Sequence, residues 1–202
     1  MARRKIRDIR HEELIAGTIR AVQAHGFAAV TMADIATEAG STAPSITYYF
    51  GSKDRLMEDT MRHLLRLLRA AFLDRIRTAR TPEDRLLAVV EANFADRLFT
   101  PAQCALWTQF WANAPHAPGL ARLHRINRAR VATHLDHALA PLVAPDRRDT
   151  VRHVLQSYMD GVWLEAAQSQ TPPDAATARA EARAVARLLL SRPPETQTHQ
   201  EK

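Results

Sequence analysis

The chain has 202 residues, of which 46% are hydrophobic and 25% are charged, so it has enough apolar side chains for a folded core. No run of about 18 apolar residues occurs, which excludes a membrane-spanning helix and leads us to expect no membrane partner and a cytoplasmic location. The formal net charge of +6 favours a polyanionic partner, and the single cysteine, Cys104, excludes an internal disulfide.

Basic residues are concentrated at the start of the chain. Arg3, Arg4, Lys5 and Arg7 precede the first predicted helix, and the only acid among the first ten residues is Asp8. Such a segment is either a disordered, solubilising tail or an arm that reaches the phosphates or a minor groove of DNA. Composition alone leaves both interpretations open.

Apolar residues recur at helical spacing along the chain, and no long stretch alternates as a strand would. We therefore predict an all-α fold of about nine helices. Leu14, Ile15, Ile19 and Val22 mark the first helix, which Gly26 ends.

Two short helices follow, joined by a tight turn at Gly40. Thr31 and Asp34 have the spacing of a capping box at the start of one helix, and Ser41 or Thr42 can cap the other. Two short helices joined by such a turn describe a helix-turn-helix, whose second helix lies in the major groove of DNA.

A helix that lies in the major groove needs small or polar side chains on its outer side, and the segment 42–50 has them. Ile46, Tyr49 and Phe50 would hold this helix to the domain, while Lys53 suits a phosphate. The residues predicted to contact DNA are Arg3, Arg4, Lys5, Arg7, Thr31, Thr42, Ala43, Pro44, Ser45, Thr47, Tyr48, Tyr49 and Lys53.

The segment "TMADIATEAGSTAPSITYYFGSKDRL", residues 31–56, resembles the DNA-binding signature of the TetR-type regulators. The matching positions are Thr31, Ile35-Ala36, Ala39-Gly40, Tyr49-Phe50, Lys53 and Leu56. Two positions depart from that pattern: Ser41 stands where the family mostly has Val, and Thr47 where it mostly has Tyr. The resemblance implies a homodimeric regulator that binds a pseudo-palindromic operator and has no enzymatic activity.

The rest of the chain predicts a larger helical domain. We expect a DNA-binding domain over residues 1–51, a ligand-binding and dimerisation domain over 52–191, and a disordered tail over 192–202. The helix 52–79 would connect the two domains. Further helices are expected from Pro82 to about Phe99, from Pro101, and over about 120–139, 146–169 and 174–190.

All three tryptophans lie in two short segments of the larger domain. Such a cluster is either ordinary core or a box for a soft cation, in which ring faces attract an ammonium and a carboxylate balances its charge. The residues predicted to bind a ligand are Trp107, Phe110, Trp111, Tyr158, Asp160 and Trp163.

These segments, "W–x–x–FW", "H–x–P–x–L–x–RL" and "DG–x–WL", resemble those of the choline-responsive repressors of glycine betaine synthesis, a TetR-type subgroup. Glu165 departs from the basic residue expected there. The resemblance implies an effector that is choline or a related quaternary ammonium compound. The alternative is a TetR-type repressor of another pathway or of an efflux pump, sensing a different aromatic or cationic compound.

The last two helices carry apolar stripes, which the family resemblance assigns to a four-helix dimer interface. Each stripe could equally face the subunit's own core. The stripe residues are Val151, Val154, Leu155, Val162, Val185, Leu188 and Leu189.

Catalytic motifs are missing from the sequence, which has no GxSxG, P-loop, HExxH or dinucleotide fingerprint. His134 and His137, with Asp136 between them, could begin a metal site, but nine scattered histidines make surface placement the better interpretation. We therefore expect no cofactor and no metal. A helical protein that binds DNA without sensing a ligand is the remaining rival.

Overall fold

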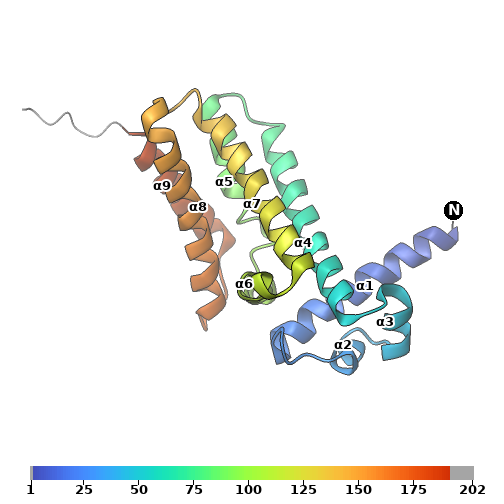
Figure 1. Cartoon of the computed structure of the whole chain (residues 1–202). Helices are drawn as coiled ribbons and strands as arrows, with labels where there is room; N and C mark the ends of the chain where they lie inside the picture. Colours follow the sequence, from blue (N-terminus) through green and yellow to red (C-terminus); the bar gives the residue numbers. More distant parts are fainter. Residues whose placement is uncertain (1, 192–202) are drawn as a thin grey trace, which may run out of the picture.

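The structure, a computed structural model, describes the backbone of residues 2–191 and the side chains of residues 8–191. This part of the chain is all-α, as the sequence predicted, with nine α-helices, one 3-10 helix and no strand (Figure 1). None of its helices is long and apolar enough to cross a membrane. The predicted disordered tail, 192–202, lies outside the described residues.

The helices are α1 (Ala2–His25), α2 (Met32–Glu38), α3 (Ala43–Phe50), α4 (Lys53–Ile76), α5 (Pro82–Ala92), α6 (Pro101–Asn113), η1 (Ala114–His116), α7 (Pro118–Leu139), α8 (Pro145–Gln168) and α9 (Ala175–Leu190). Figure 1 shows α1, α2 and α3 at one end of the molecule, which we call the reading head. Helices α4 to α9 form the body, and α4 runs from the reading head along the body's length.

Helix α1 begins earlier than the sequence analysis expected. Residues 3–7, predicted to precede the first helix as an arm, belong to α1, which starts at Ala2. No glycine or proline interrupts this basic segment, and alanine, arginine and lysine all favour helix, so the helix continues through it. The side chains of Arg3, Arg4, Lys5 and Arg7 lie outside the described residues.

Helix α5 ends earlier than expected, at Ala92 rather than near Phe99. Phe94 and Phe99 are both buried, and their rings pack edge-to-face with centroids 5.3 Å apart. In a continuous helix, residues five apart would point in clearly different directions, so the chain leaves the helix and brings both rings into one core. The turn segment 93–100 results, and it forms part of the cavity described below.

The reading head depends on one close approach between helices. A Cβ placed on Gly17 of α1 would lie 2.5 Å from Cβ and 2.6 Å from Cα of Ala39, the residue that ends α2. Only glycine lets the two backbones pack this closely. Gly40, with φ of 56°, then turns the chain toward α3 through the left-handed region that glycine favours.

The body has a continuous apolar core that includes the cysteine. Cys104 on α6 is fully buried, and this burial raises the pKa of its thiol to about 12. A thiol held neutral in an apolar core packs as a small hydrophobic side chain, which agrees with the packing role expected from the sequence.

Candidate DNA-binding and ligand-binding sites

Helix α3 has two distinct sides. Ile46 and Phe50 are buried, with 0% and 4% exposure, and hold the helix to the core of the reading head. Tyr48 is 84% exposed, the largest exposure among the exposed large hydrophobic side chains of the described chain. Thr47 beside it is also exposed, so α3 presents an aromatic ring and a hydroxyl to solvent rather than a second apolar face.

Side-chain caps fix where the two short helices begin. The Thr31 hydroxyl accepts from the Asp34 backbone N–H (3.2 Å) while the Asp34 carboxylate accepts from the Thr31 N–H (2.8 Å). The hydrogen bonds from the Thr31 hydroxyl and N–H hold the pKa of Asp34 below its usual value. Thr42 caps α3 by accepting from the Ser45 N–H at 3.3 Å. These caps set the position of the exposed side of α3.

The other residues of α3 and its N-cap that were predicted to contact DNA differ in their exposure to solvent. Thr42 and Pro44 are exposed at the start of α3, whereas Ala43, Ser45 and Tyr49 are half-buried. The Tyr49 ring packs edge-on against Tyr48, with centroids 5.5 Å apart, and so supports the exposed ring.

Lys53 and Thr47 already have intramolecular partners. The Lys53 ammonium donates to the carbonyl of Ala28, in the connection between α1 and α2, at 3.1 Å. The Thr47 hydroxyl donates to the Ala43 carbonyl at 3.0 Å and retains lone pairs for a further donor.

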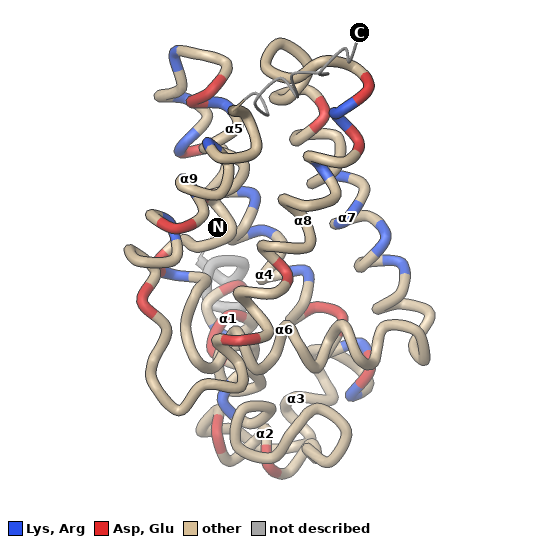
Figure 2. The backbone as a smooth tube through the Cα atoms, turned by 90° about the vertical axis from the view of Figure 1, so that its left-hand side faces the viewer, with Lys and Arg blue, Asp and Glu red and all other residues tan. Residues whose placement is uncertain are grey.

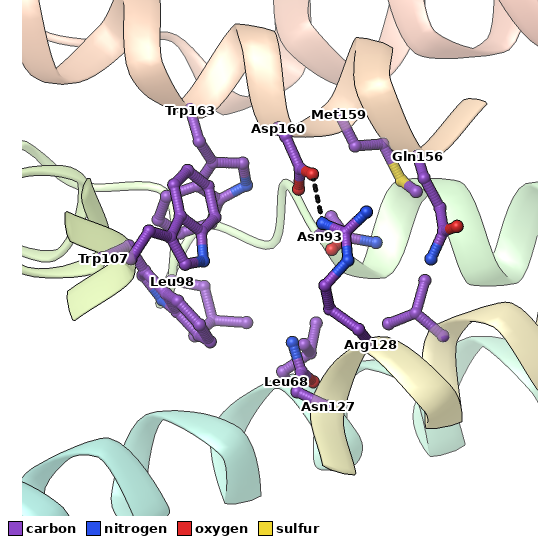
Figure 3. Close-up of a pocket in the computed structure, with 12 residues that line it drawn as sticks. Leu68, Asn93, Leu98, Trp107, Asn127, Arg128, Gln156, Met159, Asp160 and Trp163 are labelled. Atoms are coloured by element: carbon purple, nitrogen blue, oxygen red, sulfur yellow. Dashed lines mark hydrogen bonds and ion pairs between the residues drawn. The ribbon is translucent and has the colours of Figure 1, made fainter. Parts of the chain in front are cut away.

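The body contains a cavity enclosed by α4, α6, α7, α8 and the turn segment after α5 (Figure 3). Its wall has an aromatic part, made of three tryptophans, and a polar part, made of amide and charged side chains. The lining residues are Leu68, Asn93, Leu98, Trp107, Trp111, Asn127, Arg128, Val131, Gln156, Met159, Asp160 and Trp163.

The tryptophans of the two sequence segments meet in the wall. Trp107 on α6 lies with its ring centroid 5.8 Å from Trp163 on α8 and 6.1 Å from Trp111. Trp107 and Trp163 are buried, with 4% and 5% exposure, and Phe99 packs edge-on behind Trp163 at 5.3 Å. The rings are inclined to one another rather than stacked, by 66° and 47°, and all three line the cavity.

Two residues predicted to bind a ligand are not in this wall. Phe110 is fully buried on α6 and packs on Trp107 and His124, so it supports the aromatic part from behind. Tyr158 on α8 is half-buried. Its pKa is raised first by burial and then by the carboxylates of Glu181 on α9 and Glu165 on α8.

The polar part of the wall was largely missed by the sequence analysis, which named only Asp160. Asn93, Asn127, Arg128 and Gln156 reach the cavity from three different segments. Their only signal in the sequence is an amide or a charge placed among apolar neighbours, which surface positions also show. Their convergence becomes visible only when the helices are packed.

Asp160 forms an ion pair across the cavity. The guanidinium of Arg128 on α7 donates to its carboxylate at 2.6 Å (Figure 3). Both side chains are partly exposed, at 43% and 42%. The carboxylate predicted to balance a bound cation therefore already has a cationic partner.

Two polar atoms in the same wall lack a hydrogen-bond partner within the described part of the chain: Trp107 Nε1 and Asn127 Oδ1. Buried polar atoms are almost always paired, and unpaired ones in a cavity wall suit a polar ligand. The nearby imidazole of His124 is held neutral at pH 7, because burial and then Arg128 lower its pKa, opposed by Asp160.

The histidines considered for a metal do not form a site. Across residues 8–191, no group of three His, Cys, Asp or Glu side chains is arranged to hold a metal ion. His134 instead packs on the ring of Phe72, with centroids 4.3 Å apart, and burial lowers its pKa.

Comparison with known families assigns both parts of the chain. Residues 14–60 match the tetR family of bacterial regulatory proteins, and residues 82–191 match the C-terminal domain of BetI-type transcriptional repressors. The first match spans the reading head from within α1, and the second spans α5 to α9.

Individual relatives match along most of the chain. The HTH-type transcriptional regulator BetI of Burkholderia thailandensis is 35% identical over 187 residues, covering 92% of this chain and 96% of that protein. The BetI of Cronobacter sakazakii is 38% identical over 173 residues, covering 85% and 86% of the two chains. These relatives are named as regulators of transcription, not as enzymes.

Among solved structures, a transcriptional regulator from Saccharomonospora viridis, in complex with choline, superposes with a TM-score of 0.73. The superposition covers 86% of this chain and 93% of that one at 18% sequence identity. At this identity the likeness shows a shared fold.

Proposed function

Because the chain belongs to the TetR family and carries a BetI-type repressor domain, it is a DNA-binding transcriptional repressor, and we propose that choline or a related quaternary ammonium compound controls it. Its targets would be genes of glycine betaine synthesis. The single observation that carries the effector proposal is the meeting of Trp107, Trp111 and Trp163 beside Asp160 in one cavity. Ring faces and a carboxylate are the groups that bind a quaternary ammonium.

Operator recognition would rest on the exposed side of α3. Tyr48 is 84% exposed, and Thr47, Pro44 and the N-cap Thr42 of the same helix are exposed as well. These side chains would reach base edges. The basic residues 3–7 and Lys53 would contact phosphates. If each of two subunits neutralises about three phosphates, the slope of log affinity against log salt is roughly −5.

Dimerisation through α8 and α9 would place two reading heads on one pseudo-palindromic operator. Of the predicted stripes, Val154 on α8 and Leu188 on α9 are exposed, at 37% and 71%, and Leu164 on α8, which the prediction did not include, is 47% exposed. These three are half of the exposed large hydrophobic side chains of the described chain. Val151 and Leu155, from the same predicted stripe, face the subunit's own core. The exposed members are the ones that a partner subunit would cover.

The effector would act by shifting the population of two spacings of the reading heads. α4 joins head and body directly, and α6 offers a second connection. Helix α6 carries Trp107 and Trp111 of the cavity wall. Gln109 lies between them, and its side chain accepts a hydrogen bond from the Phe27 backbone N–H in the reading head. For a 100-fold release of DNA, the effector must prefer the non-binding state by about 2.7 kcal/mol.

The test is fluorescence anisotropy of the full chain on its own labelled upstream DNA, with excess nonspecific DNA present and choline titrated in. Saturable binding that choline shifts is the expected result. Tyr48→Ala should weaken specific binding by about 1–3 kcal/mol, because it removes an exposed contact without disturbing the core. Trp107→Ala and Trp111→Ala should weaken the response to choline.

Two results would overturn parts of the proposal. Specific binding that ignores choline and related ammonium compounds would retain the repressor and reject the effector class, in favour of an efflux-type or other regulator. Unchanged ligand affinity after both tryptophan substitutions would reject the aromatic box.

A further inference from the structure

The cavity presents charges of both signs. Figure 3 shows Trp107 and Trp163 together at one side and Arg128, Asp160 and Gln156 toward the other. Basic residues recur along α7, at Arg122, Arg125, Arg128 and Arg130 (Figure 2), yet Arg128 is the member of this series that lines the cavity with the tryptophans. A box built only for a cation has no use for an arginine at this place.

The ion pair affects what the cavity can bind. With Arg128 at 2.6 Å, the charge of Asp160 is largely balanced before any ligand arrives. A ligand with only a positive charge would meet a nearly neutral pair, and its ammonium would lie close to a guanidinium of like charge. Such a ligand gains from the ring faces but little from the carboxylate.

A ligand that carries a carboxylate as well resolves this conflict. Its carboxylate can accept two parallel hydrogen bonds from the Arg128 guanidinium, the geometry that arginine favours. Asp160 is then released to face the ammonium, which rests on the tryptophan rings. The four charges alternate in sign, and each has an opposite partner.

The unpaired atoms of the wall agree with a ligand rich in acceptors. Trp107 Nε1 is a donor on a side chain that is 4% exposed, and it has no acceptor within the described chain. A carboxylate offers two oxygens and about four lone-pair sites, enough for Arg128 and an indole N–H together. A hydroxyl oxygen, the only acceptor of choline, offers two.

We propose that the effector of this protein is a zwitterion, a quaternary ammonium bearing a carboxylate, held by Trp107, Trp111 and Trp163 at its cationic end and by Arg128 at its anionic end. This inference rests on the proposed function and names the class of compound within it.

The ion pair of Arg128 also joins α7 to α8, but the exposure of both side chains separates this structural contact from ligand binding. Exposed ion pairs contribute little to the free energy of folding, because water screens them. The 43% and 42% exposure of the two side chains therefore leads us to expect that Arg128 can be replaced without unfolding the protein.

The experiment is isothermal titration calorimetry of the full chain with three probes of similar size. Glycine betaine carries both charges, choline only the cation, and 3,3-dimethylbutanoate only the carboxylate. Glycine betaine should bind at least about tenfold tighter than either of the other two, the effect of one charged hydrogen-bonded contact.

The variant Arg128→Gln should weaken glycine betaine roughly 10- to 100-fold and leave choline unchanged or tighter, because Asp160 loses its competitor. Arg125→Gln is the matched control, since Arg125 is exposed on the same helix and absent from the cavity wall, and it should bind all probes as the parent does. Arg128→Lys, which keeps the charge but not the paired donors, should lie between. Circular dichroism of each variant checks folding.

The outcomes separate the two proposals. Choline binding as tightly as glycine betaine, or Arg128→Gln weakening both equally, would overturn the zwitterion inference and leave the proposed function intact. If no probe binds while specific operator binding persists, the quaternary ammonium class itself fails.

Discussion

The reading head and the cavity are built in opposite ways from the same chain. The exposed side of α3 and its caps come from one contiguous segment, residues 31–53, whose side chains act outward into solvent. The cavity is drawn from side chains between Leu68 and Trp163, which act inward and meet only because four helices and a turn segment pack together. A surface site of local origin is therefore visible in a sequence, whereas a cavity is visible only in part.

The reading head and the cavity also differ in which other residues position their side chains. Tyr48 needs only the burial of Ile46 and Phe50 on the same helix to be presented to solvent. Arg128 forms its ion pair only because Asp160, 32 residues away in the sequence, lies on a neighbouring helix. Substitutions that act on one region and spare the other can test how separate the two are.

The largest effect is expected from the close approach of α1 and α2. Gly17→Ala would place a Cβ within 2.8 Å of three Ala39 atoms, two of them backbone, which cannot move aside cheaply. We expect a loss of about 1–3 kcal/mol in the free energy of unfolding, with operator affinity reduced more than ligand affinity. Chemical denaturation and the anisotropy assay measure the two.

The matched substitution lies in the body. Gly161 on α8 is helical, and an added Cβ there meets nothing within 4 Å in the same subunit, so Gly161→Ala should stabilise the subunit fold by about 0.5–1 kcal/mol. Because Gly161 shares the exposed face of Val154 and Leu164, a loss of stability in this variant would indicate that a partner subunit packs there. Unchanged stability in Gly17→Ala would contradict the account of Gly17.

The capping box at Thr31 gives a smaller effect. Thr31→Ala removes the acceptor for the Asp34 N–H and should cost about 0.5–2 kcal/mol in stability. Thr37→Ala, an exposed threonine within the same helix whose hydroxyl bonds to its own helix backbone, should change stability by less than about 0.5 kcal/mol.

Thr31 was also predicted to contact DNA, and Thr31→Ser separates the two roles. Serine retains the cap, so stability should return to that of the parent. If operator affinity stays low in Thr31→Ser, the methyl group contributes to DNA binding beyond its place in the cap.

The smallest effect is a pH dependence that belongs to the body. Burial, and then a nearby arginine, lowers the pKa of His63 on α4 and of His124 and His134 on α7 below the ordinary value of 6.5. The folded state therefore holds these imidazoles neutral, while the unfolded chain takes up protons near pH 6.5. Stability should fall as the pH drops below about 6.5.

Thermal unfolding between pH 7.5 and 5.5 measures this dependence. Replacing His63, His124 and His134 together with Gln should flatten the profile. A profile that keeps its slope in this triple variant would assign the effect to other groups.

Most helix boundaries could be predicted from the sequence, because caps and glycines are local. The starts of α4 after Ser52 and of α9 after Asp174 lie where the pattern placed them, and of the two caps expected for α3, Ser41 or Thr42, the structure has Thr42. The early end of α5 could not be predicted, because it depends on Phe94 and Phe99 packing into the same core. The helical start of α1 was missed because positive charge was taken as a sign of an arm, although these residues favour helix.

The sequence by itself determined the all-α fold, the two short helices with their caps, and the concentration of all three tryptophans in two short segments. These depend on spacing within one helix or one turn, where a residue's neighbours are known in advance. Only the tertiary structure decided that Phe110 supports the wall while Arg128 enters it, and that Asp160 already has a partner. Burial and charge pairing between distant helices are properties of packing, which spacing along one chain does not specify.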